Sequence, residues 1–235
     1  MAESAAHIVW DWNGTLFQDM DAVITATNAA FGEVGMPAIT LETYRENYCV
    51  PVPLFYERLM GRAPTAEEWS AMDAAFHQHY TRAHLACGLA EGAAALLAGW
   101  RAPGRSQSIL SLAGHAEVVA LVRGFGIEPH FIRVEGRRGP SGGSKAEQMV
   151  AHLAALAEAG VDPGRTVVIG DAADDAVAAR HVGAHAVLYT GGSHRRESLL
   201  GAGDAVVDTL TDAVAEATRL VGTPTMTHPT GPPTA

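Results

Sequence analysis

Short apolar runs that alternate with amphipathic stretches are the feature of this sequence that most limits its fold. Six of these runs have the length and composition of buried strands: residues 7–10, 108–110, 131–134, 166–169, 186–189 and 205–207. Helical spacing of apolar residues, closed each time by a glycine, follows at residues 116–125, 146–159 and 175–182. Strands that alternate with helices build βαβ units. The sequence therefore predicts an α/β fold with a Rossmann-like, mostly parallel sheet.

One interval breaks this alternation. About ninety residues separate the first predicted strand from the second, many more than a crossover needs. They contain helical patterns at residues 22–34, 54–60 and 66–85 but no convincing strand. We therefore expect an inserted all-helical cap subdomain at residues 18–90 and an α/β core at residues 1–17 and 91–221. Residues 222–235, rich in Thr, Pro and Gly, are expected to be a disordered tail.

Charge and cysteine content narrow the classes of function. The chain has 26 acidic and 16 basic residues and a formal net charge of −10, which disfavours nucleic acid and anionic membranes as partners. Its apolar runs are too short for a membrane helix, and its first residues do not resemble a secretory signal. Cys49 and Cys87 are too few for a disulfide framework. These features favour a cytoplasmic protein with reduced thiols, and they leave its oligomeric state open.

Polar residues follow four of the predicted strands. They are Asp11 to Thr15 after the first strand, Ser111 after the second, Lys145 after the third and Gly170 to Asp175 after the fourth. The carboxyl ends of parallel strands meet at one edge of a sheet, where ligands bind. Several acids gathered there favour a hard divalent cation such as Mg²⁺. Lys145, the only lysine in the chain, and the N–H groups of the turns would then bind a phosphoryl group that a carboxylate can attack.

The same residues resemble the four motifs of the haloacid dehalogenase-like hydrolases. The first motif is the run Asp11-Trp12-Asn13-Gly14-Thr15-Leu16, and Ser111, Lys145 and the GDxxxD run from Gly170 to Asp175 follow in the order of the family. The inserted helical cap is similar to that of the phosphoglycolate phosphatase-like branch. The resemblance implies a Mg²⁺-dependent phosphatase that hydrolyses a small phosphorylated metabolite through an aspartyl-phosphate.

The resemblance also implies roles for individual residues. Asp11 would be the nucleophile, with Asn13 and Lys145 beside it in the catalytic set. The phosphate-binding set would comprise Trp12, Asn13, Ser111, Leu112 and Lys145. The metal-binding set would comprise Asp11, the carbonyl of Asn13, Asp171 and Asp175, of which Asp175 would act mainly as a partner of Asp171 or Lys145.

Asn13 departs from the family pattern. The phosphatases of the family usually carry a second Asp there, which protonates the leaving oxygen, and general acid–base catalysis typically contributes ~10²–10⁴-fold. An amide cannot supply this proton. Activity is therefore low, or the leaving group is good, or Asp19, Asp21 or His115 substitutes. The alternatives to a phosphatase are a catalytically weak phospho-ligand-binding protein and, less favoured because it needs no acidic metal site, a haloacid dehalogenase.

Other motifs carry weaker signals. The segment before Lys145 resembles a nucleotide-binding P-loop, but Ser144 precedes the lysine and Ala146 follows it, so the pattern fails on both sides. Histidines 77, 79 and 84 lack the acid or Cys that would complete a metal site. In the predicted cap, the residues that could select a substrate are Tyr44, Arg45, Tyr48, Arg58 and Arg62, for which packing and surface roles are equally good explanations. Residues 17–19 and 87–91 are the expected hinges of the cap.

Overall fold

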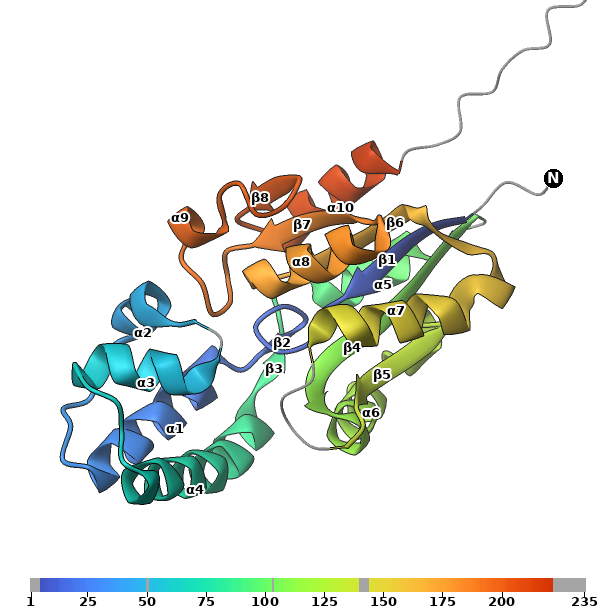
Figure 1. The fold of residues 1–235 in the computed structure, drawn as a ribbon. Coiled ribbons are helices and arrows are strands. Elements are labelled where there is room, and N and C mark those ends of the chain that lie inside the picture. The colour runs from blue at the N-terminus through green and yellow to red at the C-terminus, as the bar shows by residue number, and fades with distance from the viewer. Residues whose placement is uncertain (1–4, 50, 103, 140–143, 222–235) are drawn as a thin grey trace, which may run out of the picture.

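The computed structural model describes residues 5–49, 51–102, 104–139 and 144–221, and within them a six-stranded parallel sheet forms the centre of the molecule (Figure 1). The strand order is β5-β4-β1-β6-β7-β8, and every neighbouring pair is parallel. The strands are β1 (Ala5–Trp10), β4 (Arg105–Gly114), β5 (Arg133–Arg137), β6 (Val161–Gly170), β7 (His185–Tyr189) and β8 (Ala205–Val207). The Rossmann-like α/β fold predicted from the sequence is confirmed.

Helices cover both faces of this sheet, which is why its strands are apolar on both sides. One face packs against α5 (Ala93–Trp100), α6 (His115–Gly124) and α10 (Leu210–Leu220). The other packs against α7 (Lys145–Leu156) and α8 (Ala173–Val182). Alternate residues of β1 enter opposite cores: Ile8 and Trp10 the first, Val9 the second. Shorter elements complete the chain: η2 (Glu128–His130), η3 (Ala157–Ala159) and α9 (Arg196–Leu199).

Residues 20–86, between β1 and α5, form a separate group of helices, which we call the helical insert. It consists of α1 (Met20–Glu33), α2 (Leu41–Asn47), α3 (Val52–Met60), α4 (Ala66–Ala83) and η1 (His84–Ala86). It has its own buried apolar core, in which Phe31, Phe55 and Met72 pack together. In Figure 1 the helical insert lies beside the carboxyl ends of the strands, away from the N-terminal end of β1.

Two very short strands connect the insert to the sheet. β2 (Phe17–Gln18) pairs antiparallel with β3 (Gly88–Leu89), so the chain enters and leaves the insert side by side. The expectation that this interval contains no strand was wrong here, because two residues are too few to produce an alternating pattern. The pair coincides with the expected hinges at residues 17–19 and 87–91. The exact domain boundaries and the hinge motion remain predictions.

Several element boundaries differ from the sequence-based ones. β5 begins at Arg133 rather than at residue 131, and β4 continues past Ser111 to Gly114, with irregular pairing to β5 between Leu110 and Gly114. Ser111 therefore lies inside an irregular stretch of β4, and not after the strand as expected. Among the described residues, no helix is long and apolar enough to cross a membrane. The predicted disordered tail lies outside the described residues.

Candidate active site

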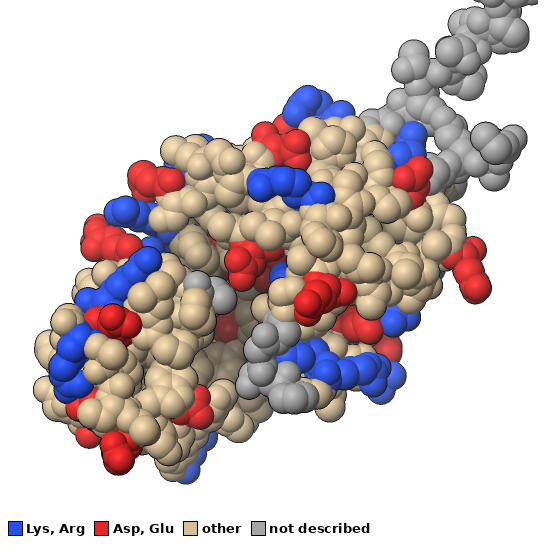
Figure 2. Space-filling model, viewed as in Figure 1, with Lys and Arg blue, Asp and Glu red and all other residues tan. Residues whose placement is uncertain are grey.

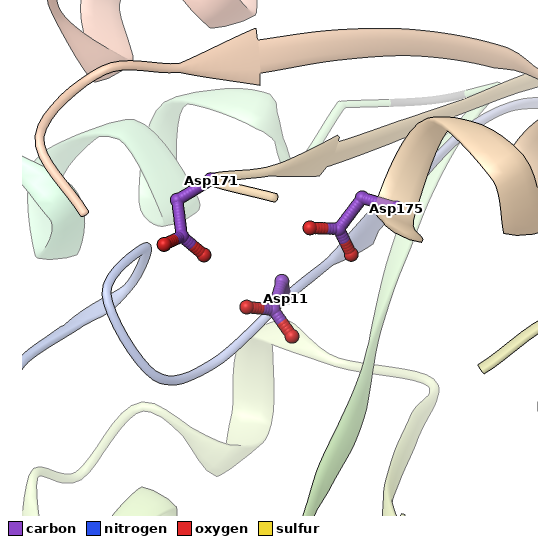
Figure 3. Close-up of side chains that lie close together, drawn as sticks. All are labelled: Asp11, Asp171 and Asp175. Carbon is purple, nitrogen blue, oxygen red and sulfur yellow. The ribbon is translucent and has the colours of Figure 1, made fainter. Parts of the chain in front are cut away.

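Three aspartates meet at the carboxyl edge of the sheet. Asp11 follows β1 directly, Asp171 follows β6, and Asp175 lies in the first turn of α8. All three are buried, and one carboxylate oxygen of each lies within 4.8 Å of the others (Figure 3). Among the described residues, these three form the only group of metal-ligating side chains close enough together to hold a metal ion. The fold thus brings together the three acids that the sequence places in the metal-binding set.

Lys145 is the cation of this cluster. It is the first residue of α7, which the side chain of Ser144 caps by accepting a hydrogen bond from Glu147 N at 3.2 Å. Its buried Nζ forms ion pairs with Asp11 and with Asp175. Burial opposes the charge of Lys145, but these two carboxylates raise its pKa overall.

The charges of the cluster do not balance. Burial, together with the neighbouring Asp175 and Asp171, raises the pKa of Asp11 to about 8, although Lys145 acts in the opposite direction. Burial and Asp175 likewise raise the pKa of Asp171. Three buried carboxylates beside one ammonium leave a negative excess, which is costly in a protein interior. A hard divalent cation with oxygen ligands, such as Mg²⁺, fits both the donor atoms and the missing charge.

Close contacts hold Asp171 in place. Ser193 donates two hydrogen bonds to its Oδ2, from the backbone N and from Oγ, both at 2.6 Å. Gly14 adopts a left-handed conformation with φ +71°, and a Cβ at this position would lie 2.8 Å from Asp171 Oδ2. A Cβ at Gly192 would lie 2.2 Å from the same oxygen. Both glycines are therefore needed so that the backbone can approach this carboxylate.

Sequence reasoning missed Ser193. It lies in the loop that follows β7, so it occupies the same edge of the sheet as the predicted residues. The signal was available: the run Gly191-Gly192-Ser193 follows the fifth predicted strand. Applying the strand-end rule to that strand as well would have included it.

Asn13 takes part in a hydrogen-bond network that links the sheet to the helical insert. Its Nδ2 donates to Asp19 Oδ2 at 2.8 Å and to the hydroxyl of Tyr80, on α4, at 2.9 Å. The Tyr80 hydroxyl donates to the same Asp19 oxygen at 2.6 Å, and Gly14 N donates to Asp19 Oδ1 at 2.9 Å. The buried Asp19 carboxylate therefore accepts three hydrogen bonds.

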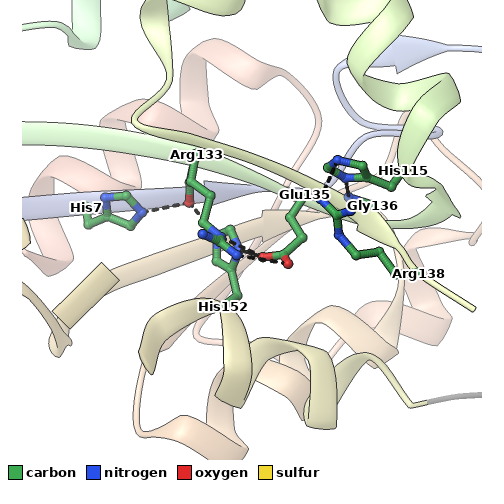
Figure 4. Close-up of polar contacts among 8 residues, drawn as sticks. His7, His115, Arg133, Glu135, Gly136, Arg138 and His152 are labelled. Atoms are coloured by element: carbon green, nitrogen blue, oxygen red, sulfur yellow. Dashed lines mark hydrogen bonds and ion pairs between the residues drawn. The ribbon is translucent and has the colours of Figure 1, made fainter. Parts of the chain in front are cut away.

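Of the three residues considered as substitutes for the missing acid, the fold brings only Asp19 to the site. Asp21 is exposed on α1. His115 binds elsewhere: its Nδ1 accepts from Gly136 N at 3.2 Å, and its Nε2 lies 2.6 Å from Arg138 (Figure 4). Asp21 and His115 are thus removed from the candidates.

The predicted phosphate-binding residues lie around the aspartates in different ways. Ser111 is buried, and its Oγ lies 3.5 Å from Asn13 Oδ1 while accepting from Ala113 N at 3.0 Å. Leu112 lines the same cavity as the aspartates. The side chain of Trp12 is part of the core, where its ring stacks on Phe17 at 5.4 Å. Only the backbone of Trp12 can serve the site.

Two adjoining cavities open above these residues. A cavity of about 190 Å³ is lined by Lys145 and by the three aspartates of the cluster. A larger one, of about 830 Å³, extends from it between the sheet and the helical insert, and Asn13, Asp19 and Leu112 line both. Figure 2 shows the hollow between the two parts of the molecule, with acidic side chains at its edge.

Arg45 and Tyr48 connect the insert to the loop after β7. The Arg45 guanidinium donates to Gly192 O at 2.7 Å and to Gly191 O at 2.8 Å. The ring of Tyr48 packs against His194 at 5.2 Å. Two of the other residues proposed for substrate selection lie elsewhere: Arg58 donates to Asn47 O, and Arg62 pairs with Glu68 on the surface of the insert.

The histidines of α4 and η1 form no metal cluster with other ligands in the described part of the chain. His77 lies 3.5 Å from Asp73, and the ring of His84 stacks on Tyr80 at 5.3 Å. His79 is exposed.

Known proteins share this fold. Residues 144–213 match the family model described as HAD-hydrolase-like. A haloacid dehalogenase-like hydrolase from Streptococcus pneumoniae is 20% identical, with a TM-score of 0.74 over 90% of this chain and 98% of that one. A predicted phosphatase from Clostridium acetobutylicum (13%, TM-score 0.75, 93% and 100%) and a predicted phosphoglycolate phosphatase from Haemophilus somnus (18%, TM-score 0.71, 92% and 99%) are also similar.

A second similarity is in sequence. The chain is 28% identical over 197 residues to the tyrosine-protein kinase PtkA of Mycobacterium tuberculosis and Mycobacterium bovis. The match covers 83% of this chain and 65% of those proteins, so the chain spans about two thirds of the length of these relatives.

Fold and site together define the class: an α/β protein with acids gathered at the carboxyl edge of a parallel sheet and helices inserted after its first strand. More particularly, the fold is that of the haloacid dehalogenase-like hydrolases. The family model over residues 144–213 confirms the resemblance indicated by the sequence motifs, and the similar structures share the fold.

Proposed function

We propose that the protein is a Mg²⁺-dependent phosphatase that hydrolyses a phosphomonoester through an aspartyl-phosphate on Asp11. The observation that carries this proposal is the buried cluster of Asp11, Lys145, Asp171 and Asp175 at the edge of the sheet. A buried carboxylate beside an ammonium group, with further acids in excess of the available positive charge, is suited to phosphoryl transfer assisted by a cation.

In this proposal the residues of the cluster have separate roles, and Asp11 has two of them. Asp11 attacks phosphorus, the bond to the leaving oxygen breaks, and water then hydrolyses the acyl phosphate and regenerates the carboxylate. Lys145 neutralises a phosphoryl oxygen and is oriented by Asp175. Ser111 and the backbone N–H groups of the first loop bind the remaining oxygens. Mg²⁺, held by Asp11, Asp171 and the carbonyl of Asn13, would supply charge neutralisation on the phosphoryl group.

The helical insert is the proposed cap of the site. It is linked to the core through β2 and β3, and it contacts the catalytic loop through Tyr80 and the β7 loop through Arg45. These contacts support a role for the insert in excluding bulk water from the phosphoryl group. The proposed cap is residues 18–90, with the core at residues 1–17 and 91–221.

A phosphotransferase acting on tyrosine is the second candidate, because the mycobacterial relatives bear that name. Formation of an aspartyl-phosphate followed by transfer to a hydroxyl other than water would use the same residues. A phospho-ligand-binding protein with little turnover is the third candidate, because the amide of Asn13 cannot protonate the leaving oxygen as a carboxylic acid would. Dehalogenation is disfavoured, because it needs no metal ion and would not require the additional buried acids.

Phosphate release measured with Mg²⁺ and with EDTA separates these candidates. The proposal expects release from phosphomonoesters that requires Mg²⁺ and is lost in Asp11→Asn. Transfer of the terminal phosphate of a nucleoside triphosphate to a tyrosine peptide, without hydrolysis of monoesters, would support the kinase. Stabilisation by phosphate in a thermal-shift assay without any turnover would support a binding protein.

A further inference from the structure

The larger cavity is lined by aromatic rings that are already packed against one another. Phe55, Tyr56, Trp69, Phe76 and Tyr80 all face it from the helical insert. The rings of Tyr56 and Trp69 lie 5.7 Å apart, and those of Phe76 and Tyr80 stack at 5.8 Å. Its volume of about 830 Å³ is that of a site for a sizeable organic molecule. A very small metabolite would leave most of this aromatic wall in contact with water.

The charges around the same cavity disfavour a second anionic group on the substrate. Arg137 is the only lysine or arginine among the described residues that line this cavity. Its guanidinium is already engaged, because it donates to Leu112 O at 3.1 Å and to Gly139 O. Asp73 and Glu117 add negative charge, and the two histidines of the lining, His77 and His84, lie 3.5 Å and 3.6 Å from these acids. This lining favours a substrate body that carries no carboxylate or second phosphate.

The contacts of Asn13 limit the chemistry of the leaving group. Its amide cannot donate a proton to the leaving oxygen, and both amide contacts are to Asp19 and Tyr80. The Tyr80 hydroxyl already donates to Asp19, and the Asp19 carboxylate accepts hydrogen bonds from Asn13, Gly14 N and Tyr80, so neither side chain offers a free proton to the leaving oxygen. A leaving oxygen must then depart with little help from an acid. A phenol, with a pKa of about 10, tolerates this far better than an aliphatic alcohol, whose pKa is close to the ~16 of water.

We propose that the substrate is an aryl phosphomonoester whose uncharged aromatic body fills the larger cavity. The inference rests on the proposed phosphatase function. The bond between phosphorus and the phenolic oxygen breaks while a carboxylate oxygen of Asp11 bonds to phosphorus, and the released phenolate takes a proton from solvent. Water then attacks the phosphoryl group of the aspartyl-phosphate, which releases inorganic phosphate and frees Asp11.

Four esters test size and leaving group separately. Phenyl phosphate and 2-naphthyl phosphate differ in size but have similar leaving groups, whereas 2-naphthylmethyl phosphate keeps the size and has an alcohol as its leaving group. 2-Phosphoglycolate is small and anionic. We expect the KM for 2-naphthyl phosphate to be about tenfold or more below that for phenyl phosphate. 2-Naphthylmethyl phosphate should bind similarly but turn over at least ~100-fold more slowly.

Variants of the cavity wall connect this preference to the structure. Phe76→Ala, and Phe76→Leu if the first variant unfolds, should abolish most of the difference in KM between the naphthyl and phenyl esters. Val177→Ala, on the exposed side of α8, is the control and should preserve the difference. Equal KM values for the two aryl esters in the unmodified protein, or unchanged discrimination in both Phe76 variants, would overturn the inference.

The outcomes also separate this inference from the proposed function. Efficient, Mg²⁺-dependent hydrolysis of 2-phosphoglycolate with poor hydrolysis of the aryl esters would refute the substrate class and leave the phosphatase proposal intact. Hydrolysis of none of the four esters would refute the phosphatase proposal, and the inference with it.

Discussion

Asn13 and Asp19 form a hydrogen-bonded pair at the centre of the site, in which the amide donates and the carboxylate accepts. An amide is therefore more stable at position 13 than a second carboxylate, which could not donate this hydrogen bond. Asn13→Asp would place a second carboxylate 2.8 Å from Asp19 Oδ2, where two negative charges repel. We expect the substitution to lower the free energy of unfolding by about 1–3 kcal/mol, because a buried hydrogen bond is replaced by repulsion. Urea denaturation at neutral pH measures this change.

A reversed pair provides the matched control. In the double variant Asn13→Asp with Asp19→Asn, the amide and the carboxylate exchange places and the hydrogen bond can form again. Most of the lost stability should return. If the double variant is no more stable than Asn13→Asp, repulsion between the two positions is not the cause.

Ser193 is predicted to tune the affinity for the metal rather than the chemical step. Its hydroxyl holds the Asp171 oxygen at 2.6 Å, and loss of such a supporting contact typically weakens metal binding by ~10–100-fold. Ser193→Ala should therefore raise the Mg²⁺ concentration for half-maximal activity about tenfold, with kcat unchanged at saturating Mg²⁺. Ser198→Ala, exposed on α9, serves as the control. A lowered kcat at saturating Mg²⁺ would instead assign Ser193 to the reaction itself.

At the scale of elements, Arg45 connects α2 to the loop after β7 through hydrogen bonds. Its two hydrogen bonds to Gly191 O and Gly192 O require a planar guanidinium. We expect Arg45→Ala to lower kcat/KM by about tenfold or more, because the proposed cap no longer closes stably over Asp11. Steady-state kinetics of a phosphomonoester measures this effect.

Arg58→Ala is a suitable control for this prediction, because the hydrogen bond of Arg58 is to Asn47 O, within the insert. It should leave kcat/KM nearly unchanged. Equal losses in the two variants would mean that the effect comes from general destabilisation of the insert and not from the contact with the β7 loop.

The elements of the core were predictable because their strands are buried on both faces and appear as continuous apolar runs. The gathering of Asp11, Lys145 and Asp171 was equally predictable, since parallel strands end at one edge. β2 and β3 were not, because two residues give no periodicity. The contact of Asn13 with Tyr80 was also beyond the sequence, because 67 residues separate them and only the packing of α4 brings them together.

At the scale of the whole molecule, a chain of buried polar groups crosses from the sheet to α7 (Figure 4). His7 Nε2 lies 2.8 Å from Ser108 Oγ, which lies 2.8 Å from His152 Nε2, and His152 Nδ1 lies 2.9 Å from Glu135. Burial, together with nearby His152, lowers the pKa of His7 to about 3, and burial also lowers the pKa of His152. Both histidines are therefore neutral in the folded protein at neutral pH.

This network predicts loss of stability in mild acid. As the pH falls below the ordinary histidine pKa of about 6.5, His7 and His152 bind protons in the unfolded chain but not in the folded protein. The contribution of these two histidines to the free energy of unfolding should be fully present above that pH and fall below it, by up to about 1.4 kcal/mol per pH unit for each, whereas the raised pKa of Asp11 contributes with the opposite sign. Urea denaturation between pH 4 and 7 measures the slope, and His7→Gln should reduce it. An identical slope in that variant would contradict the role of His7.

The central claim is that Asp11 carries the phosphoryl group, and rapid acid quenching of a single turnover tests it most directly. With a ³²P-labelled phosphomonoester that the protein hydrolyses and with Mg²⁺ present, we expect label on the peptide that contains Asp11, lost on treatment with hydroxylamine as an acyl phosphate is. Asp11→Asn should carry no label and release no phosphate. Phosphate release without labelled protein, or at an unchanged rate in Asp11→Asn, would contradict the account.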